Sequence, residues 1–252
     1  MLRKLTKAVR ILTRRRLASA LIRHGVAGAI EHLPIIDFVR PSYLIDVGAN
    51  KGQFALATLS LFPDVRIECF EPLPGPGKIL QAWSSHMTDQ ITLHQCALAR
   101  SRGRSKFYVT NREDSSSLFE PGSPQKVAGI DVSRTIEVAT ERLDSVIDKA
   151  SISSPSLLKM DVQGGELDVL IGSEGILSSI DFVYLELSFI QLYKNQPLFN
   201  DLYEYLVQRG FFLRGLANCY TDKVRGPTQV DALFCKQKIR NLPKSNGSTA
   251  VG

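Results

Sequence analysis

Four residues at alternate positions, Asp46, Gly48, Asn50 and Gly52, stand between a short apolar run and a helical pattern over residues 53–61. Glycine lacks a Cβ and asparagine tolerates positive φ better than most side chains, so the spacing predicts a tight turn between a buried strand and a helix. Such a turn lets a ligand lie against bare backbone at the helix N-terminus. The segment therefore predicts a binding site for a small molecule.

The segment departs from the dinucleotide-binding pattern in an informative way. A G-x-G-x-x-G turn presents a helix N-terminus to a pyrophosphate. Here Asn50 takes the place of the second glycine, and Gly52 comes one residue too early to be the third. The carboxylate of Asp46 would repel a phosphate and attract a cation. S-adenosylmethionine, which has an amino group, a sulfonium and no phosphate, fits these features.

A second carboxylate supports this cofactor. The mostly apolar run over residues 65–70 predicts the next strand, and Glu71 and Pro72 follow it. In Rossmann-type sites, a carboxylate about twenty residues past the glycine turn accepts hydrogen bonds from the ribose hydroxyls. We expect Glu71 to hold the ribose, with Pro72 beside it and with Cys96 and Ala97 lining the same cofactor site after the third strand.

The rest of the chain alternates between strand and helix patterns, which predicts an α/β fold with a doubly wound, mostly parallel sheet. The expected strands cover residues 43–46, 65–70, 91–95, 156–160, 182–186, 211–216 and 231–235, and the expected helices cover residues 53–61, 76–86, 142–149, 166–171 and 198–208. In such sheets the ligand lies over the carboxyl ends of the strands.

Residues 104–140 interrupt the alternation. Short strand patterns at 106–110 and 135–139 flank a polar stretch that contains Ser116 and Ser117. A connection of this length in a compact domain usually has a use. We expect an inserted hairpin that forms a lid, with the two serines facing the acceptor substrate.

Three carboxylates are candidates for the chemistry: Asp161 at the end of a strand, Glu166 at the start of a helix, and Glu186 at the end of the next strand. Methyl transfer from a sulfonium needs alignment, and a hydroxyl acceptor must also lose a proton, which a nearby carboxylate can take. Hard cations prefer oxygen ligands, so Mg²⁺ held by Asp161 and Glu186 is an open alternative. No tight acidic cluster favours a metal.

Composition limits the other function classes. The chain has 252 residues and a formal net charge of +6, yet eight of its 31 lysines and arginines fall in residues 1–30, which hold no acidic residue. The remainder has 23 basic against 25 acidic side chains, so it lacks the excess of cations that gripping a nucleic acid requires. The four scattered cysteines indicate neither a zinc site nor a disulfide framework, and they favour a cytoplasmic protein.

The pattern divides the chain into a basic arm (1–33), one catalytic domain (34–238) and a tail (239–252). Leu2, Leu5, Val9 and Leu12 share one helical stripe opposite basic residues. This stripe could pack on the domain, lie on an anionic membrane surface through residues 1–23, or belong to a targeting peptide. We expect the first.

Together these motifs resemble one known family. Over residues 40–236 the chain resembles the FkbM family of S-adenosylmethionine-dependent methyltransferases. The motifs that carry the resemblance are D-V-G-A-N-K-G-Q-F, the E-P dipeptide at 71–72, S-S-L in the insertion, L-L-K-M-D-V-Q-G-G-E-L-D-V-L and V-Y-L-E-L-S-F-I-Q-L-Y. The resemblance implies a class I methyltransferase (Rossmann-like) fold and O-methylation of a sugar or other small metabolite. It implies that Asp46, Gly48, Asn50, Gly52 and Glu71 hold the cofactor, and that Asp161, Gln163 and Glu166 face the acceptor.

Other classes fit less well. The chain lacks both the Asn/Asp-Pro-Pro-aromatic run of nucleic-acid amino-methylating enzymes and the Pro-Cys dipeptide of cytosine C5 enzymes. A carboxyl or N-methyltransferase of a small molecule, or a binding protein that keeps the cofactor pocket without transfer, remains as an alternative. Tyr193 could line the acceptor pocket or close the core.

Overall fold

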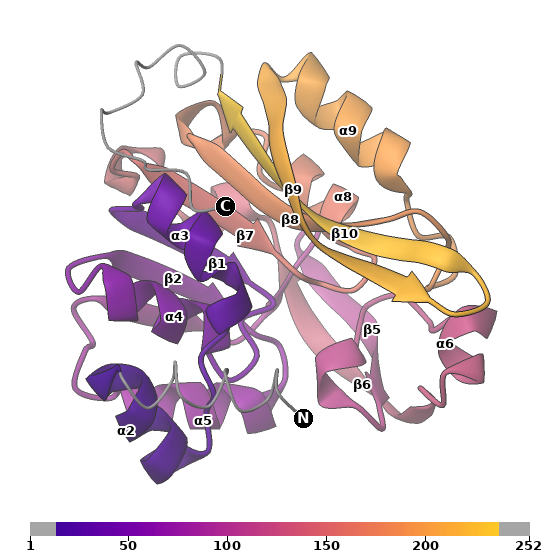
Figure 1. Cartoon of the computed structure of the whole chain (residues 1–252), viewed down its shortest axis with the longest axis horizontal. Coiled ribbons are helices and arrows are strands. Elements are labelled where there is room, and N and C mark those ends of the chain that lie inside the picture. Colours follow the sequence, from indigo (N-terminus) through magenta and orange to yellow (C-terminus); the bar gives the residue numbers. More distant parts are fainter. Residues whose placement is uncertain (1–13, 237–252) are drawn as a thin grey trace, which may run out of the picture.

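The computed structural model describes residues 14–236, and its centre is a twisted sheet of seven strands (Figure 1). The spatial order is β3 (Ile91–His94), β2 (Arg66–Phe70), β1 (Tyr43–Val47), β7 (Ser156–Met160), β8 (Phe182–Ser188), β10 (Gly226–Lys236) and β9 (Phe211–Asp222). The first five strands in this order pair in parallel, whereas β10 runs antiparallel to both β8 and β9. This is the Rossmann-like sheet of class I methyltransferases, as the sequence predicts.

Helices cover both faces of the sheet. One layer consists of α2 (Arg15–His24), α3 (Leu33–Val39), α4 (Gln53–Leu61) and α5 (Pro74–Ser84), and the other consists of α7 (Leu143–Val146), α8 (Glu166–Ile171) and α9 (Phe199–Gln208). Single 3₁₀ turns lie at η1 (Ile30–His32), η3 (Lys149–Ser151) and η4 (Leu177–Ser179). Because both faces are covered, the central strands are mostly apolar, with single charged residues such as Asp46 in β1 and Lys159 in β7.

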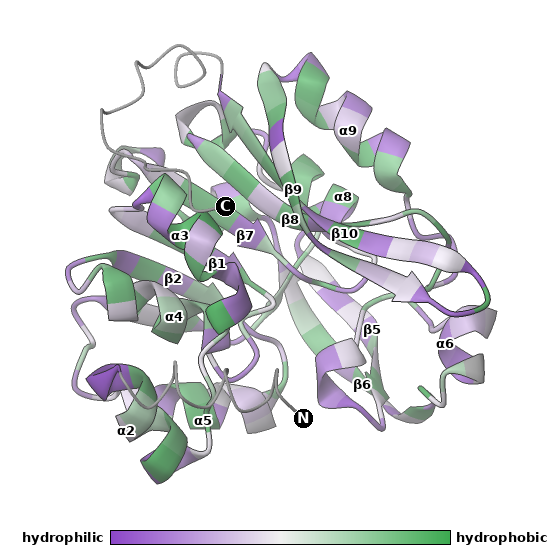
Figure 2. Cartoon of the chain, viewed as in Figure 1, coloured by the Kyte–Doolittle hydropathy of each residue, from purple (hydrophilic) through white to green (hydrophobic). Residues whose placement is uncertain are grey.

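Each central strand supplies side chains to two separate apolar cores. Leu44 of β1 packs with the first helical layer, whereas its neighbours Tyr43 and Ile45 pack with the second. Figure 2 shows the consequence in colour, since β8 is apolar along much of its length while α9 carries both apolar and polar residues. Burial on both faces fixes the register of the strands, because a slip of one residue would exchange the two sets of side chains.

The predicted insertion is present as a small second sheet. It contains β4 (Ala97–Leu98), β6 (Val132–Glu141) and β5 (Gly103–Thr110) in that order, and β5 and β6 form the antiparallel hairpin. Between them lie η2 (Glu113–Ser115) and α6 (Ser123–Val127). Figure 1 shows this sheet below the long β9–β10 hairpin, at one end of the central sheet.

Two elements differ from the prediction. The expected helix over 142–149 is the four-residue α7, because the carboxylate of Asp148 accepts a hydrogen bond from the backbone N–H of Ala150 at 2.9 Å and starts a separate 3₁₀ turn. Strands β9 and β10 are 12 and 11 residues long, much longer than the expected runs. The extension of β9 is largely exposed and carries no apolar alternation, whereas the extension of β10 begins with Gly226 and Pro227, which a sequence pattern does not assign to a strand.

The described part of the predicted arm packs into the domain. Leu17 and Ala20 of α2 are buried in the same core as Leu44, Phe54 and Leu80. On the opposite side of α2, Ile22 is 76% exposed. The stripe at Leu2–Leu12 and the tail from 239 lie outside the described residues, and among residues 14–236 no helix is long and apolar enough to span a bilayer.

This packing predicts a stability difference within one helix. Replacing the fully buried Leu17 with Ala should lower the free energy of unfolding by about 3 kcal/mol, because it removes apolar contact and leaves a cavity. The matched change Ile22→Ala should alter it by less than about 0.5 kcal/mol. Urea denaturation of both variants measures the difference, and equal effects would mean that α2 is not docked in solution.

Candidate active site

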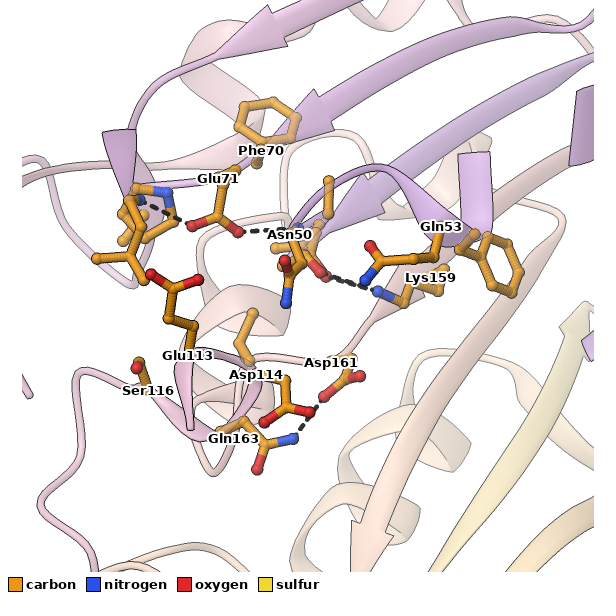
Figure 3. Close-up of a pocket in the computed structure, with 18 of the residues that line it drawn as sticks. Asn50, Gln53, Phe70, Glu71, Glu113, Asp114, Ser116, Lys159, Asp161 and Gln163 are labelled. Carbon is orange, nitrogen blue, oxygen red and sulfur yellow. Dashed lines mark hydrogen bonds between the residues drawn. The ribbon is translucent and has the colours of Figure 1, made fainter. Parts of the chain in front are cut away.

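A cavity of about 410 Å³ lies over the carboxyl ends of β1, β2 and β7. The chain runs from β1 to β2 and β3 on one side of β1 and later returns to β7 on its other side, so the cavity occupies the topological switch point of the sheet. Figure 3 shows the turn after β1, the end of β2 and the segment after β7 around this space, with η2 of the insertion closing it from another side. The insertion therefore has the position of the predicted lid.

The turn after β1 has the predicted left-handed backbone. Gly48, Asn50 and Gly52 have φ values of 71°, 50° and 80°. A Cβ on Gly48 would stand 1.9 Å from the carbonyl oxygen of Asp161, so only glycine allows the turn to approach the segment after β7. Gly48 and Asn50 line the cavity, as predicted. Buried Oδ1 of Asn50 has no hydrogen-bond partner among the described residues, so it can receive a ligand N–H or O–H.

Gly52 does not line the cavity, which corrects its predicted cofactor contact. It is the residue that precedes α4, and a Cβ there would come 2.6 Å from the ring of Trp83 and 3.0 Å from Leu80. Its glycine serves helix packing rather than ligand approach. Trp83 holds the same turn, since its indole N–H donates to the carbonyl of Lys51 at 2.8 Å.

Glu71 has the geometry expected of a ribose carboxylate. It lines the cavity with Pro72, Cys96 and Ala97. The backbone N–H groups of Asn50 and Leu73 donate to its two carboxylate oxygens at 2.9 and 2.8 Å, which holds the side chain against the turn (Figure 3). Burial raises the pKa of Glu71 to about 7, despite these hydrogen bonds.

Asp46 has a different role from the predicted one. It is fully buried and does not line the cavity, so it makes no direct contact with a ligand there. Its carboxylate pairs at 2.9 Å with the ammonium of Lys159, a residue in the middle of β7 that does line the cavity. Lys159 also donates to the carbonyl of Gly48 at 3.1 Å. Burial acts to lower the pKa of Lys159, but the carboxylates of Asp46 and Asp161 outweigh it and raise that pKa.

After β7, Asp161 and Gln163 line the cavity as predicted. The amide nitrogen of Gln163 donates to Oδ1 of Asp161 at 2.7 Å, and the hydroxyl of Tyr193 lies 2.8 Å from the amide oxygen of Gln163. This chain of contacts fixes both side chains at the cavity wall. Tyr193 itself is fully buried and outside the cavity, so it closes the core instead of contacting an acceptor.

Glu166 and Glu186 are not cavity residues, which corrects their predicted catalytic roles. The carboxylate of Glu166 accepts hydrogen bonds from the backbone N–H groups of Val162 and Gly164 at 3.1 Å, so it braces the turn before α8. Burial raises its pKa to about 7. Glu186 accepts a hydrogen bond from Gln229 on the neighbouring strand. Burial, with Asp161 and Glu166 nearby, raises the pKa of Glu186 well above its usual value.

Of the two serines in the insertion, one lines the cavity and the other bonds to the backbone of neighbouring segments. Ser116 lines the cavity, as predicted. Ser117 does not: its hydroxyl donates to the carbonyl of Gln163 at 2.7 Å and accepts from the N–H of Phe119 at 2.9 Å. Those bonds tie the insertion to the turn after β7, so the structure gives the predicted substrate contact of Ser117 no support.

Several cavity residues escaped the sequence analysis. Besides Lys159, they are Glu113 and Asp114 of η2, Glu31 and His32 of η1, and Tyr220 of β9. A lysine inside an otherwise apolar strand was a visible signal for Lys159. The others lie in polar segments without a motif, and tertiary packing alone brings them to the site.

The described residues contain no group of three or more His, Cys, Asp or Glu side chains that could hold a metal ion. The alternative ligand pair Asp161 and Glu186 therefore gains no support, since Glu186 is engaged with Gln229 outside the cavity.

The methyltransferase FkbM domain model matches residues 46–213, which is well over half of the chain. This chain belongs to the FkbM methyltransferase family. The matched range contains the glycine turn, Glu71, the insertion and the segment after β7, so it confirms the resemblance that the sequence motifs indicate. It leaves out η1 and β10.

Named relatives include three methyltransferases. The chain is 30% identical over 161 residues to the 2-O-methyltransferase NoeI of Sinorhizobium fredii, 29% over 181 to the 31-O-demethyl-FK506 methyltransferase FkbM of Streptomyces tacrolimicus, and 28% over 147 to the hexuronic acid methyltransferase AglP of Haloferax volcanii. The alignments cover 61%, 61% and 57% of this chain, and 66%, 64% and 55% of the relatives, less than two-thirds of each. Among solved structures, TrmK of M. capricolum with S-adenosyl-homocysteine matches at 12% identity with a TM-score of 0.43, over 82% of this chain and 68% of that one.

The cavity fits S-adenosylmethionine on its own geometry. Glu71 can accept from ribose hydroxyls, and Oδ1 of Asn50 is a buried acceptor without a partner among the described residues. Phe70, Cys96 and Leu98 supply apolar walls for an adenine. The carboxylate of Asp161 lies on the same cavity and suits a cationic sulfonium and amino group.

Cofactor affinity should depend on pH through Glu71. Ribose hydroxyls donate to the ionised form of Glu71. With a pKa of about 7, Glu71 is protonated below pH 7 in the empty site, so the cofactor must displace that proton in order to bind. Affinity for S-adenosylhomocysteine should therefore be constant above pH 7 and fall by about tenfold per pH unit below it. Isothermal titration calorimetry between pH 6 and pH 8.5 measures this dependence.

The variant Glu71→Ala should bind S-adenosylhomocysteine about tenfold to a hundredfold more weakly at pH 8. Its affinity should no longer fall below pH 7. Glu174→Ala, which removes an exposed carboxylate that pairs with Arg209, is the control and should behave like the parent. A Glu71→Ala protein with parental affinity and the same pH profile would show that Glu71 does not contact the cofactor.

Proposed function

We propose that this chain is an S-adenosylmethionine-dependent O-methyltransferase that acts on a hydroxyl of a sugar or other small metabolite. The observation that carries the proposal is one cavity in which the ribose carboxylate Glu71 and the carboxylate Asp161 face a common space from β2 and β7 (Figure 3). Family membership and the names of the relatives, two of which specify O-methylation, support the same reaction.

The residues divide the work between binding and alignment. Glu71 and Asn50 hold the nucleoside end, and the Lys159–Asp46 pair keeps the turn after β1 fixed beneath it. The bound cofactor supplies an electrophilic methyl group on a positively charged sulfur. Asp161, oriented by Gln163, accepts a hydrogen bond from the acceptor hydroxyl and aligns its oxygen for in-line attack.

The acidic lining bears on the acceptor. Glu31, Glu113, Asp114 and Asp161 join Glu71 around the cavity, and Lys159 is the cation among its described lining residues. This balance favours a cationic cofactor and disfavours an anionic group close to the transferred methyl. We propose a neutral hydroxyl as the acceptor, with the insertion and its Ser116 completing the wall around it.

The reaction can be tested with labelled cofactor and a panel of methyl glycosides of fucose, N-acetylglucosamine and glucuronic acid. If Asp161 aligns the acceptor, Asp161→Asn should lower turnover about a hundredfold and leave affinity for S-adenosylhomocysteine within a few-fold. Asp168→Asn, which removes a carboxylate paired with Arg100 away from the cavity, should keep the parental rate. Added EDTA should have no effect.

Three outcomes would contradict parts of the proposal. Cofactor binding without transfer to any member of the panel would favour a binding protein, and loss of activity in EDTA that Mg²⁺ restores would make the carboxylates metal ligands. A product whose methyl group is released by mild base would indicate a carboxyl acceptor rather than a hydroxyl.

A further inference from the structure

His32 enters the cavity from outside the family-matched range. It ends η1 and lines the cavity together with Glu31 and Tyr220, and its side chain is 18% exposed. The rings of Phe54 and Tyr184 lie 5.5 and 5.6 Å from the imidazole centroid and hold it from two sides. This histidine is therefore a positioned side chain of the cavity wall.

A hydrogen-bond chain behind His32 sets its tautomer. Nδ1 of His32 lies 2.9 Å from the hydroxyl oxygen of Tyr184, and that hydroxyl donates to Oδ2 of Asp231 at 3.0 Å. The amide of Asn218 donates to the same oxygen at 2.8 Å. A carboxylate attracts the single tyrosine proton more strongly than an imidazole nitrogen does. The amide nitrogen of Asn218 also lies 3.3 Å from Nδ1, which is a longer contact than the one to Tyr184. The shorter contact favours the tautomer in which Nδ1 carries the hydrogen and donates it to the tyrosine oxygen.

That tautomer leaves Nε2 with its lone pair. No hydrogen bond among the described residues engages Nε2, whereas Nδ1 faces the buried chain of Tyr184 and Asp231. An imidazole whose Nδ1–H donates to a hydroxyl that is itself bonded to a carboxylate, with Nε2 unengaged at a cavity wall, has the arrangement of a general base.

His32 also lies on the side of the cavity that remains for an acceptor. The ribose carboxylate follows β2, on one side of β1 in the sheet. The partners of His32 stand on the other side, with Tyr184 in β8 and Asp231 in β10. Asp161 follows β7, between these two positions. Across the sheet, in the direction from β2 to β10, Glu71 therefore comes first, Asp161 second and His32 third.

The surrounding charges leave the imidazole neutral near pH 7. Burial lowers the pKa of His32 below 6.5 and outweighs the carboxylates of Asp231, Glu31 and Asp161, which act to raise it. The ammonium of Lys159 acts in the same direction as burial. The other neighbours of the ring, Phe54, Tyr184 and Asn218, carry no charge.

We propose that His32 is the general base of the transfer and that Asp231, through Tyr184, is its positioning residue, an inference that rests on the proposed function. The acceptor O–H proton passes to Nε2 of His32 as the acceptor oxygen forms its bond to the methyl carbon. The carbon–sulfur bond breaks and its electron pair stays on sulfur, which neutralises the sulfonium. Asp161 holds the hydroxyl in line, and the imidazolium formed is stabilised by Asp231.

The first test uses the full chain and the same glycoside panel. His32→Gln should lower kcat at least a hundredfold, with affinity for S-adenosylhomocysteine within a few-fold of the parent. His86→Gln, at an exposed position of the same chain, is the matched control and should keep the parental kcat. In the parent, kcat should fall on the acid side of a single ionisation below pH 6.5, and this limb should vanish in His32→Gln.

The second test reads the imidazole directly and needs no acceptor. Nitrogen NMR of uniformly labelled parent protein, assigned through His32→Gln, should show the Nδ1–H tautomer at pH 7.5 and a pKa below 6.5. In Asp231→Asn the pKa should fall further, because a carboxylate that stabilises the imidazolium is lost. The acid limb of kcat should move with it. A purely structural role for Asp231 would lower thermal stability without moving either value.

The outcomes separate the two proposals. Cofactor binding without methyl transfer by the parent protein would end the proposed function, whatever the state of His32. Transfer that persists within a few-fold in a folded, cofactor-binding His32→Gln protein would instead overturn the role of His32 and leave Asp161 as the proton acceptor. An Nε2–H tautomer, or a pKa above 6.5, would overturn the inference even without an active acceptor.

Discussion

The buried ion pair between Lys159 and Asp46 fixes the relation between the two strands on which the site is built. Both residues lie on neighbouring parallel strands, β7 and β1, and the ammonium also reaches the carbonyl of Gly48 in the turn. Removing either partner would leave an uncompensated charge in the core, which typically costs about 3–5 kcal/mol. The pair thus couples the turn that approaches the cofactor to the strand that delivers Asp161.

Two buried glutamates near the site have similarly raised pKa values but different surroundings. Burial brings the pKa of Glu71 and of Glu166 to about 7, although each accepts backbone N–H bonds that favour the ionised form. Glu71 opens on the cavity, where ligand hydroxyls can replace lost water, whereas Glu166 faces the turn before α8. Identical side chains therefore differ in function because one faces a ligand and the other faces backbone.

Two segments outside the central alternation complete the cavity. The insertion contributes Glu113, Asp114 and Ser116, and the hydroxyl of Ser117 ties it to the carbonyl of Gln163. The segment before β1 contributes Glu31 and His32 of η1, whose Ile30 is buried in the same core as Leu17 of α2. The insertion and the segment before β1 lie outside the sheet, whose strand ends supply the cofactor side of the cavity. Enzymes that share this fold can therefore differ in these segments and accept different substrates.

The sequence determined the features that depend on local patterns. Apolar runs and their terminating residues predicted β7, α4 and α8 at their observed bounds and β1 to within one residue, because burial on both faces of the sheet leaves a continuous signal. Spacing also predicted the left-handed turn at Gly48 and Asn50, because backbone sterics limit which residues such a turn accepts. The motifs indicated the family and the position of Glu71 at the cavity.

Tertiary structure alone decided which of several similar side chains reach the ligand. Asp46, Glu166 and Glu186 stand at strand or helix ends as Asp161 does, yet each is turned away and satisfied by Lys159, by backbone N–H groups or by Gln229. His32 entered through packing with β8 and β10, across a sequence separation of 152 residues to Tyr184. Sequence spacing carries no record of such contacts, because they arise from burial and hydrogen bonding between elements that meet only in the folded chain.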